Sequence, residues 1–442
     1  QVIMTVWLRR SGTGAFTQQP IDVETNPSPV IMAGGLGGGN LSQYWLEDDG
    51  KMLTDEQRER IAARFGKALP TRKAKPPYRV PLMSEIRALP WNGFTVASTF
   101  AGGGGSSLGY RMAGFRIGYA NEFVEAARDT YRANAWEGTT LDGSDIRTVE
   151  APAILAALGM KPGDLDIFDG SPPCSSFSTA GKREKGWGEV KKYSDTEQRT
   201  DDLFLEYIRL VDGLRPKVFV AENVKGLVLG TAFGFYRQVH ERLTALGYRV
   251  EARVLNAKWL GVPQSRERTI FVGVRDDLGF APVFPEPLPY IYSIADAIPW
   301  LRNGSSQGGV DITGYAIGNE WDRLKPGEQS DKYFQLVRPD PNLPVGTITA
   351  EGGNASIASV THPFERRKFS IPEVKRLCSF PDDWAVSGSY TQQWERMGRA
   401  VPPVMMMAIA SAIRDQILIP HREATCSRSS KSPSNGRSKR TR

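Results

Sequence analysis

Short apolar runs alternate with amphipathic helix patterns through the middle of the chain, and this alternation constrains the fold more than any other feature. Two stretches, 203–214 and 231–246, place apolar residues on one face at helical spacing. Strand, helix and strand at such intervals predict right-handed crossovers and a doubly wound, mostly parallel sheet with helices on both faces. The expected fold class is therefore α/β. The expected strands are 95–100, 116–121, 165–169, 217–222, 249–255 and 269–274.

The chain of 442 residues is too long for one simple core, so we expect a main domain with smaller regions around it. Residues 91–275 form the main domain in this interpretation, and 361–420 complete it after an irregular insertion, 276–360, rich in Pro, Gly and Asn. Residues 1–90 form an N-terminal extension to which we assign no function. This extension contains one predicted helix, 54–69.

The net charge of +7 is concentrated in residues 421–442, which hold seven Arg or Lys and one Glu and leave the rest nearly neutral. This Ser-rich tail is predicted to be disordered, either adding loose phosphate affinity or acting as a solubilising segment. No apolar run of 18 residues and no secretory signal pattern is present, which predicts a cytoplasmic protein without membrane contact. Three dispersed cysteines and three histidines predict neither a disulfide framework nor a metal site.

A glycine-rich loop, FAGGGGSSLGYRMAGF (100–115), follows the first strand and opens a helix. Its glycines lack the spacing of a dinucleotide-binding loop, and no Gly-Lys-Ser/Thr ending for a nucleoside triphosphate is present. Glu122 ends the next strand, where a carboxylate would face ribose hydroxyls, and Asp145 could reach an adenine amine. Alternatively, Glu122 only caps the helix that follows it. A nucleoside ligand fits this pattern best.

A cysteine, Cys174, lies in the loop GSPPCSSFS just after another expected strand, where parallel sheets place their chemistry. The two prolines would hold its sulfur in a defined turn, although a cysteine beside a strand is often only a small buried residue. Glu222 ends the next strand, and Arg266 and Arg268 lie in the extended segment QSRER before the last one. A sulfur, an acid and two guanidinium groups could meet at one edge of the sheet.

In this order, the loop FAGGGGSSLG and the segments GSPPCSSFS, AENV and QSRERTIFVG resemble the motifs of the cytosine-C5 DNA methyltransferases. The resemblance continues through RRKFSIPEVKRLCSFPDDW and GRAVPPVMMMAIASAI, so it covers residues 94–418. It implies a Rossmann-like methyltransferase fold, S-adenosyl-L-methionine as the cofactor, and a small target-recognition region at 276–360. TIT, residues 347–349, resembles the segment where that region rejoins the core.

The same resemblance implies a role for each site residue. Cys174 would add to C6 of a cytosine flipped out of the duplex, which makes C5 able to attack the methyl group. Glu222 would hydrogen-bond N3 and the exocyclic amine, and Arg268, with Arg266 nearby, would bind O2 or the flanking backbone. Residues 179–199 resemble the mobile catalytic loop, though a merely solvated charged loop is an alternative. The implied cofactor-binding residues are Phe100, Gly102, Gly104, Glu122, Phe123, Asp145 and Ile146.

Double-stranded DNA is the partner that the resemblance implies, for a monomer with a cognate restriction endonuclease as a candidate partner protein. Two departures from the family pattern bear on DNA docking: Cys378-Ser379 stands where Gln-Gly is common, and Arg399 where Asn is common. Cys378 itself is expected to be buried and inert. The alternatives are a tRNA cytosine-C5 methyltransferase, a DNA-binding relative without catalysis and, third, a nicotinamide dehydrogenase.

Overall fold

The computed structural model describes residues 75–173, 202–228, 233–302 and 308–429, together with short strand segments outside these ranges. Those segments pair as antiparallel hairpins, β1 with β2, β3 with β4 and β9 with β10. The helix predicted at 54–69 lies outside the described residues. The hairpin strands are β1 (Ile3–Arg9), β2 (Phe16–Asp22), β3 (Glu47–Asp48), β4 (Lys51–Met52), β9 (Lys191–Tyr193) and β10 (Thr196–Gln198).

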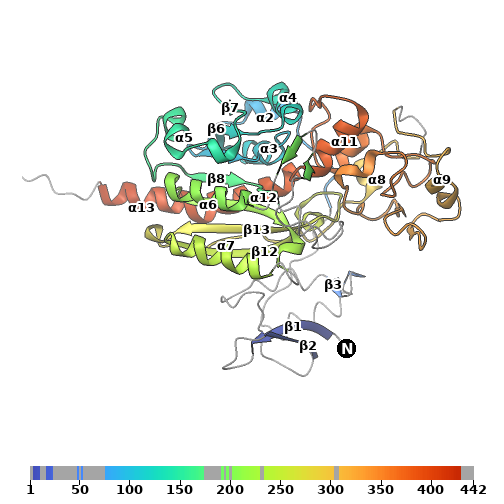
Figure 1. The fold of residues 1–442 in the computed structure, drawn as a ribbon, viewed down its shortest axis with the longest axis horizontal. Helices are drawn as coiled ribbons and strands as arrows, with labels where there is room; N and C mark the ends of the chain where they lie inside the picture. Colours follow the sequence, from blue (N-terminus) through green and yellow to red (C-terminus); the bar gives the residue numbers. More distant parts are fainter. Residues whose placement is uncertain are drawn as a thin grey trace, which may run out of the picture.

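A seven-stranded sheet in the order β12-β13-β11-β8-β5-β6-β7 forms the centre of the protein (Figure 1). Five of its strands, β5, β6, β7, β8 and β11, pair in parallel, and β13 runs antiparallel to both of its neighbours. The predicted α/β class and mostly parallel sheet are confirmed. The strands are β5 (Thr95–Thr99), β6 (Arg116–Asn121), β7 (Thr140–Asp142), β8 (Ile167–Gly170), β11 (Val218–Val224), β12 (Tyr248–Asn256) and β13 (Glu267–Arg275).

Side chains alternate between two apolar layers along each central strand, which is why these strands are apolar throughout. Phe168, Phe219 and Phe271 pack on one face with α5 (Ala151–Leu158), α6 (Leu203–Leu214) and α7 (Phe233–Ala245). Their chain neighbours Ile167, Val218 and Val272 pack on the other face with α3 (Gly105–Met112) and α12 (Pro403–Ile413). The sheet is therefore doubly wound, with α4 (Glu125–Asn134) connecting β6 to β7.

The antiparallel direction of β13 follows from a short connection. Only the 3-10 helix η6 (Ala257–Leu260) and a brief loop join β12 to β13, and a parallel crossover needs a longer segment. The edge strand β7 was not predicted, because its three residues are partly exposed and too few to show a period.

The predicted insertion, 276–360, contains short elements around a small core of its own. Ile312, Ile317, Trp321, Leu324 and Leu336 form that core. The described elements here are η7 (Asp276–Leu278), α8 (Ile294–Ala297), α9 (Ala316–Trp321), β14 (Glu328–Gln329), β15 (Val337–Arg338) and η8 (Ala350–Gly353). Figure 1 shows α8 and α9 in a lobe at one end of the sheet, beside α11 (Tyr390–Arg399).

Residues 75–90, which the sequence placed in the N-terminal extension, pack on the body of the protein. They include α2 (Met83–Ala88), whose Met83 and Ile86 are buried in the same core cluster as Leu377 and Trp394. The Tyr78 hydroxyl donates to the carbonyl of Arg376 at 2.7 Å. The sequence did not reveal this packing, since the apolar residues of the stretch are too widely spaced to be recognised as core.

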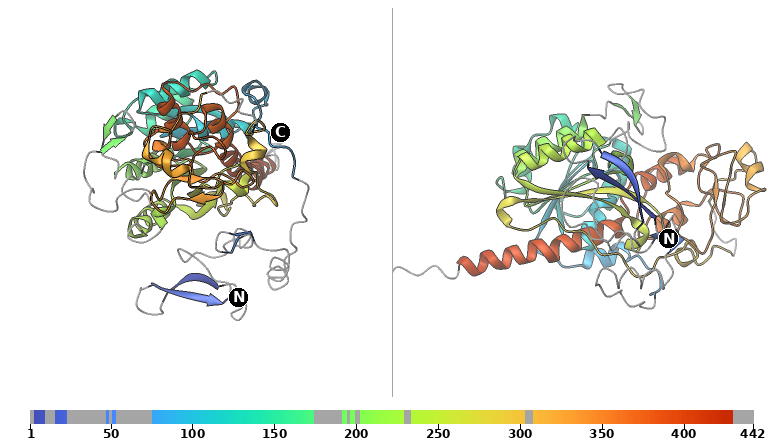
Figure 2. Two further views of the ribbon diagram at one scale, coloured as in Figure 1. Left: turned by 90° about the vertical axis from the view of Figure 1, so that its right-hand side faces the viewer. Right: turned by 90° about the horizontal axis from the view of Figure 1, so that it is seen from below.

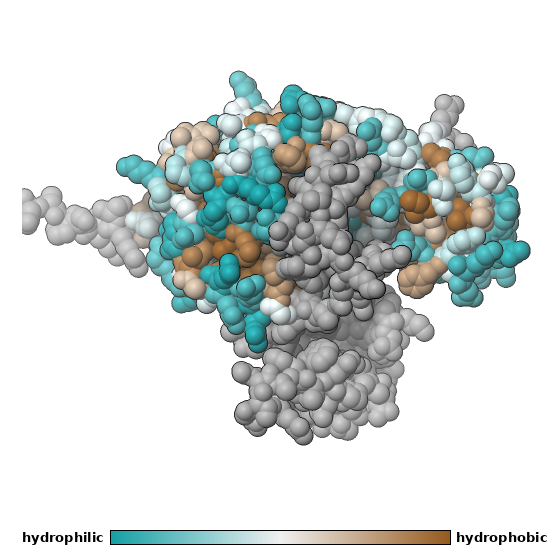
Figure 3. Space-filling view, viewed as in Figure 1, coloured by the Kyte–Doolittle hydropathy of each residue, from teal (hydrophilic) through white to brown (hydrophobic). Residues whose placement is uncertain are grey.

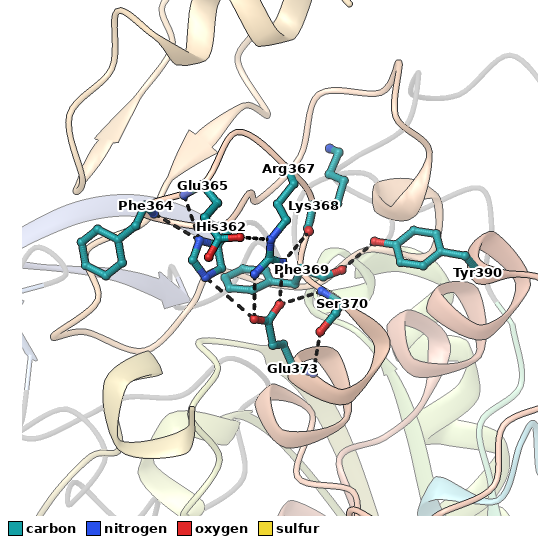
Figure 4. Close-up of polar contacts among 9 residues, drawn as sticks. All are labelled: His362, Phe364, Glu365, Arg367, Lys368, Phe369, Ser370, Glu373 and Tyr390. Carbon is teal, nitrogen blue, oxygen red and sulfur yellow. Dashed lines mark hydrogen bonds and ion pairs between the residues drawn. The ribbon is translucent and has the colours of Figure 1, made fainter. Parts of the chain in front are cut away.

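A buried polar network joins the insertion to α10 (Ile371–Leu377) (Figure 4). The Arg367 guanidinium donates to both carboxylate oxygens of Glu373, at 2.8 and 2.9 Å, and Glu373 is fully buried. Glu373 also accepts from the backbone N–H of Ser370, which caps α10. His362 lies 3.8 Å from the same carboxylate. This network fixes the chain where it leaves the insertion.

The C-terminal helix extends further than the sequence predicted. α12 continues through a π-helical turn (Arg414–Leu418) into α13 (Ile419–Ser429), which projects from the body in Figure 2. The prediction of disorder from residue 421 was therefore wrong up to Ser429, because an established helix propagates easily and Arg422 contacts the Phe94 ring. The described stretch Tyr390–Ser427 is long and apolar enough to cross a membrane by composition, but 56% of its most apolar window is buried inside the protein.

The close approach of α3 and α12 gives a stability prediction. A Cβ at Gly109 would lie 2.5 Å from both Met406 Cβ and the Pro403 carbonyl oxygen. Gly109→Ala is therefore expected to lower the free energy of unfolding by about 1–3 kcal/mol in urea denaturation. Gly234→Ala, in the exposed first turn of α7 with nothing near its Cβ position, is the control and should be neutral or stabilising. Equal effects at the two positions would contradict the packing argument.

Candidate active site

The carboxyl ends of β5, β6, β8 and β11 meet at one edge of the sheet, where a parallel sheet binds ligands. A cavity of about 540 Å³ lies there, lined by the segments that follow these strands. Arg266 and Arg268, at the start of β13, also line it, as do segments around Thr349 and Arg399. The cavity is thus lined by predicted cofactor-binding residues and by predicted catalytic residues. Residues of the insertion and of the C-terminal part also line it.

The glycine loop forms one wall of this cavity. Phe100 has a left-handed backbone with φ 53°, a conformation that costs free energy for a residue with a side chain and is concentrated at functional sites. Glu122 holds the loop, because its carboxylate accepts from the backbone N–H of Gly102 at 2.7 Å and from that of Val124 at 2.7 Å. Burial raises the pKa of Glu122, and these two hydrogen bonds oppose the rise.

The predicted nucleoside-binding residues lie together at this end. Glu122, Phe123, Asp145 and Ile146 all line the cavity, and Phe123 is 39% exposed. Glu122 also contacts the start of α4, because it accepts from the backbone N–H of Val124, the N-cap residue of that helix. Asp145 caps the 3-10 helix η2 (Ile146–Thr148) by accepting from the backbone N–H of Arg147. Carboxylates beside an aromatic and an aliphatic surface fit ribose hydroxyls, an adenine amine and an adenine ring.

Gly104 is the one described cofactor-site prediction that does not line the cavity. A Cβ there would meet Tyr131 and Trp384 instead, and its φ of 98° makes the turn that begins α3. Gly102, Gly103 and Gly105 form the cavity wall in this loop. The sequence shows four successive glycines and cannot show which of them face a ligand.

The opposite end of the cavity carries a buried ion pair. Glu222 Oε1 lies 2.8 Å from Arg268 Nε, and the two side chains are only 12% and 15% exposed. The pairing of β11 with β13 causes this contact, because Val224 lies opposite Arg268 and Glu222 lies two residues away on the same face. Desolvation lowers the pKa of Arg268, and Glu222 opposes that shift.

Arg266 lies behind this pair and is 2% exposed. Its Nη1 donates to the carbonyl of Ile348 at 3.2 Å, and its Nε has no hydrogen-bond partner among the described residues. Burial, followed by repulsion from Arg268, lowers the pKa of Arg266 to about 9. Since this guanidinium is buried, it acts on the cavity mainly through its positive charge behind the Glu222–Arg268 pair.

The segment leading to Cys174 lies between the two ends. Ser171, Pro172 and Pro173 line the cavity, and Asn223 Nδ2 donates to the Pro172 carbonyl at 3.0 Å. Cys174 lies outside the described residues, so the structure places its immediate neighbour and not its sulfur. The loop expected at 179–199 also lies outside them, apart from strands β9 and β10.

Comparison with known proteins decides the family. The model of the C-5 cytosine-specific DNA methylase family matches residues 94–415. The chain belongs to this family. It is a DNA (cytosine-5-)-methyltransferase, which favours DNA over the tRNA substrate left open by the sequence.

Curated relatives agree with this methyltransferase assignment, and a solved structure agrees with the fold. The type II methyltransferase M.NgoFVII of Neisseria gonorrhoeae is 32% identical over an alignment of 346 residues that covers 72% of this chain and 86% of that one. M1.HphI of Haemophilus parahaemolyticus is 30% identical with the same coverage. An E. coli prophage protein described as a DNA modification methyltransferase has the same fold, with a TM-score of 0.59 at 19% identity over 74% of this chain and all of that one.

The methyltransferase family generally uses S-adenosylmethionine and acts on DNA.

The segment TIT, which the sequence predicts to be the junction between the insertion and the core, packs on residues 263–265. Thr347 Oγ1 donates to the Ser265 carbonyl at 2.9 Å, and Val345 exchanges backbone hydrogen bonds with residues 263 and 265. The segment that leaves the insertion therefore packs on QSRER.

The two departures from the family pattern lie in different surroundings. Cys378 is 2% exposed, as expected, and burial raises the pKa of its thiol to about 11. Its sulfur accepts from Gln264 Nε2 at 3.3 Å, and Ser379, with φ 60°, follows it. Arg399 instead lines the cavity. The first departure is therefore accommodated in the core, and the second is in the site.

Asp169 is a buried residue behind the glycine loop that the sequence argument missed. It is 2% exposed and accepts from Ser98 Oγ at 2.9 Å, Ser106 Oγ at 2.8 Å and the Tyr110 hydroxyl at 3.2 Å. Burial raises the pKa of Asp169 to about 6. Since Ser106 lines the cavity, Asp169 ties the glycine loop to β8. The sequence signal that could have identified Asp169 is its place as an acid at the end of the apolar run LDIFD.

Proposed function

We propose that this methyltransferase transfers a methyl group from S-adenosylmethionine to C5 of a cytosine flipped out of double-stranded DNA, through a covalent bond between Cys174 and C6. One observation carries the proposal: a single cavity holds the nucleoside-binding wall at one end and the Glu222–Arg268 pair at the other. The wall that leads to Cys174 lies between them.

The residues of the cavity account for the cytosine chemistry. Cys174, as a thiolate, adds to C6, and Glu222 holds a proton at N3 and accepts from the exocyclic amine, where charge changes as sulfur adds. Arg268 donates to O2 and keeps Glu222 in place. S-adenosylmethionine, when bound, supplies the electrophilic methyl group. Transfer of the C5 proton to a water molecule and departure of the Cys174 thiolate then restore the double bond between C5 and C6.

Glu122 and Asp145 would hold the ribose and the adenine amine, with Phe123 and Ile146 against the adenine ring. The open wall at Gly102 and Gly103 lets the ligand approach the backbone closely. These acceptors and apolar surfaces fit an adenosyl group, and Glu122 keeps unused lone pairs because each oxygen accepts one backbone hydrogen bond.

Residues 276–360 would read the DNA sequence in this proposal. Tyr315, Phe334 and Leu343 are large apolar side chains exposed on this lobe, at 43%, 80% and 51%. Figure 3 shows apolar residues on the surface of the lobe that carries α8 and α9. Such residues suit contacts with base edges and thymine methyl groups. A cytoplasmic monomer, with a cognate restriction endonuclease in the same system, completes the proposal, which the similarity to type II methyltransferases supports.

The test combines methylation mapping with covalent trapping. In cells expressing the protein, bisulfite sequencing should show cytosines protected in one recurring short context, and Cys174→Ser should abolish the protection. Purified protein should form a covalent adduct with DNA containing 5-fluorocytosine, because fluorine blocks the loss of the C5 substituent. Cys426→Ser, an exposed cysteine in α13, is the matched control and should keep both signals.

Other outcomes would replace the proposal. Methyl transfer to tRNA alone would indicate the tRNA enzyme. Folded protein that binds DNA but neither protects cytosines nor forms the adduct would indicate a relative without catalysis. Trapping that survives Cys174→Ser would assign the nucleophile to another residue.

A further inference from the structure

The buried carboxylate of Asp169 is a charged group that the proposed chemistry does not use. It is 2% exposed, and its three donors are neutral hydroxyl groups, those of Ser98, Ser106 and Tyr110. Within the part of the chain that the structure describes, no Lys, Arg or His forms an ion pair with it. An ionised carboxylate that is buried without a counter-charge costs free energy, which makes Asp169 a candidate for a functional role.

The order of the strands places this carboxylate between the two ends of the cavity. Neighbouring strands follow in the order β11, β8, β5 and β6, with Glu222 in β11, Asp169 in β8 and Glu122 directly after β6. Because Asp169 lies opposite Val220 of β11, its side chain is on the same face of the sheet as that of Glu222, two residues further on. Asp169 therefore lies between the catalytic pair and the nucleoside wall.

The residues next to Asp169 form the cavity wall at this place. Ser106 lines the cavity, and its Oγ lies 2.8 Å from Asp169 Oδ2. Ser171 and Pro172, which follow the end of β8, line the cavity as well. A charge inside a protein is screened much less than one in water, so the charge of Asp169 acts across this wall on a ligand in the cavity.

The other charges near this wall are balanced or lie further along the sheet. Glu222 and Arg268 form an ion pair at 2.8 Å, and Arg266 lies on the segment that leads into β13, one strand beyond β11. Asp169 therefore adds an unbalanced negative charge behind the middle of the cavity. The other titratable side chains that face it are phenols that stay neutral, since burial raises the pKa of each: Tyr110, Tyr131 and Tyr207.

The methyl donor of the proposed function and its product differ in charge at one atom. S-adenosylmethionine carries a positively charged sulfonium, whereas S-adenosylhomocysteine carries a neutral thioether. This sulfur belongs between the two ends of the cavity, because its methyl group passes from the adenosyl side to the base. We propose that Asp169 is the counter-charge of the sulfonium and makes the protein bind the methyl donor in preference to the demethylated product, an inference that rests on the cofactor assignment above.

The test is isothermal titration calorimetry of the full chain without DNA, so that no methyl transfer occurs. S-adenosylmethionine is compared with neutral S-adenosylhomocysteine and with sinefungin, an analogue that carries an ammonium group in place of the methylated sulfonium. Asp169→Asn is expected to weaken binding of the two cationic ligands roughly 5- to 30-fold and that of S-adenosylhomocysteine by less than about twofold. Tyr110→Phe is the matched control, because it removes a donor to the same carboxylate but no charge, and it should affect the three ligands alike.

The wild-type protein offers a second measurement that needs no variant. Burial raises the pKa of Asp169 to about 6, so its charge is present above that pH and is lost below it. The preference for S-adenosylmethionine over S-adenosylhomocysteine is therefore expected to fall between about pH 8 and about pH 5.5. Glu222 is the other carboxylate that faces Asp169, so the series is repeated with Glu222→Gln, in which the fall should persist.

Each contrary result has a separate meaning. An equal loss for all three ligands would show that Asp169 only holds the glycine loop in place, and this result, or no loss at all, would overturn the inference. Thermal unfolding shows whether Asp169→Asn is folded. If it is not, the pH series decides, and a preference that does not change with pH would overturn the inference. Wild-type protein that binds none of the three ligands would overturn the cofactor assignment itself, and the inference with it.

Discussion

Replacing Glu222 with glutamine is expected to lower kcat for methyl transfer by about 10²- to 10⁴-fold, with the affinity for S-adenosylhomocysteine unchanged. The reason is the position of Glu222 in the cavity. Glu222 is 12% exposed and lies 2.8 Å from Arg268, at the end of the cavity away from the nucleoside wall. Glutamine keeps the shape but cannot hold a proton at N3 of cytosine, and it leaves Arg268 without its counter-charge.

Single-turnover methylation of a DNA duplex, with calorimetry for the ligand, separates these effects. Glu267→Gln is a close control, because Glu267 precedes Arg268 in the chain but is 42% exposed and pairs with Lys225. It should change kcat by less than twofold. A Glu222→Gln variant that retains kcat within a factor of two would remove Glu222 from the mechanism.

Removing the carboxylate of Glu373 is expected to lower the free energy of unfolding by about 3–5 kcal/mol, since it leaves two N–H groups of a buried guanidinium without their acceptor and only the more exposed Glu365 as a counter-charge. Arg367 and Glu373 make two hydrogen bonds at 2.8 and 2.9 Å, and their side chains are 10% and 0% exposed (Figure 4). Glu373→Ala in urea denaturation measures the loss. Replacing both residues with methionine should restore much of it, because the charge that then loses its partner is that of Glu365, whose side chain is 35% exposed to water.

The control is a more exposed pair in the same part of the chain. Arg366 and Asp322 lie 2.8 Å apart with side chains 25% and 50% exposed, so Asp322→Asn should cost less than about 1 kcal/mol. A Glu373→Ala variant as stable as this control would contradict the assignment of the network as a buried junction.

The same network should make the protein sensitive to acid. Burial, with repulsion from Arg367, lowers the pKa of His362 to about 4, and its Nδ1 accepts from the backbone N–H groups of Phe364 and Glu365. The unfolded chain therefore binds more protons than the folded one between pH 6.5, the usual histidine pKa, and about 4. Stability falls as the pH falls through that window.

The central strands could be predicted from the sequence because they are buried on both faces and read as apolar runs. The helix face of Leu203, Tyr207, Leu210 and Leu214 could be predicted for the same reason, and all four residues are buried. The edge strand β7, by contrast, has only three partly exposed residues. Its position follows from pairing with β6, which no local pattern encodes.

Site residues could be predicted where a residue lies at the end of an expected strand and also belongs to a motif that resembles the family. Glu122, Glu222 and Arg268 each lie beside a strand terminus, and the parallel sheet brings them to one edge. Asp169 was missed because its role depends on contacts with Ser98, Ser106 and Tyr110, which lie about 60 to 70 residues before it in the sequence. The position of Cys174 stays a prediction, since only the wall up to Pro173 is described.

The contact between Gly105 and Val401 has a consequence for how the protein matures. Two segments almost 300 residues apart in the sequence close one wall of the cavity, with no room between them for a methyl group. During synthesis, every predicted catalytic motif leaves the ribosome before this wall exists. A nascent or truncated chain that lacks Val401 therefore carries these motifs without the closed cavity wall, which forms only when the segment around Val401 has docked on the glycine loop.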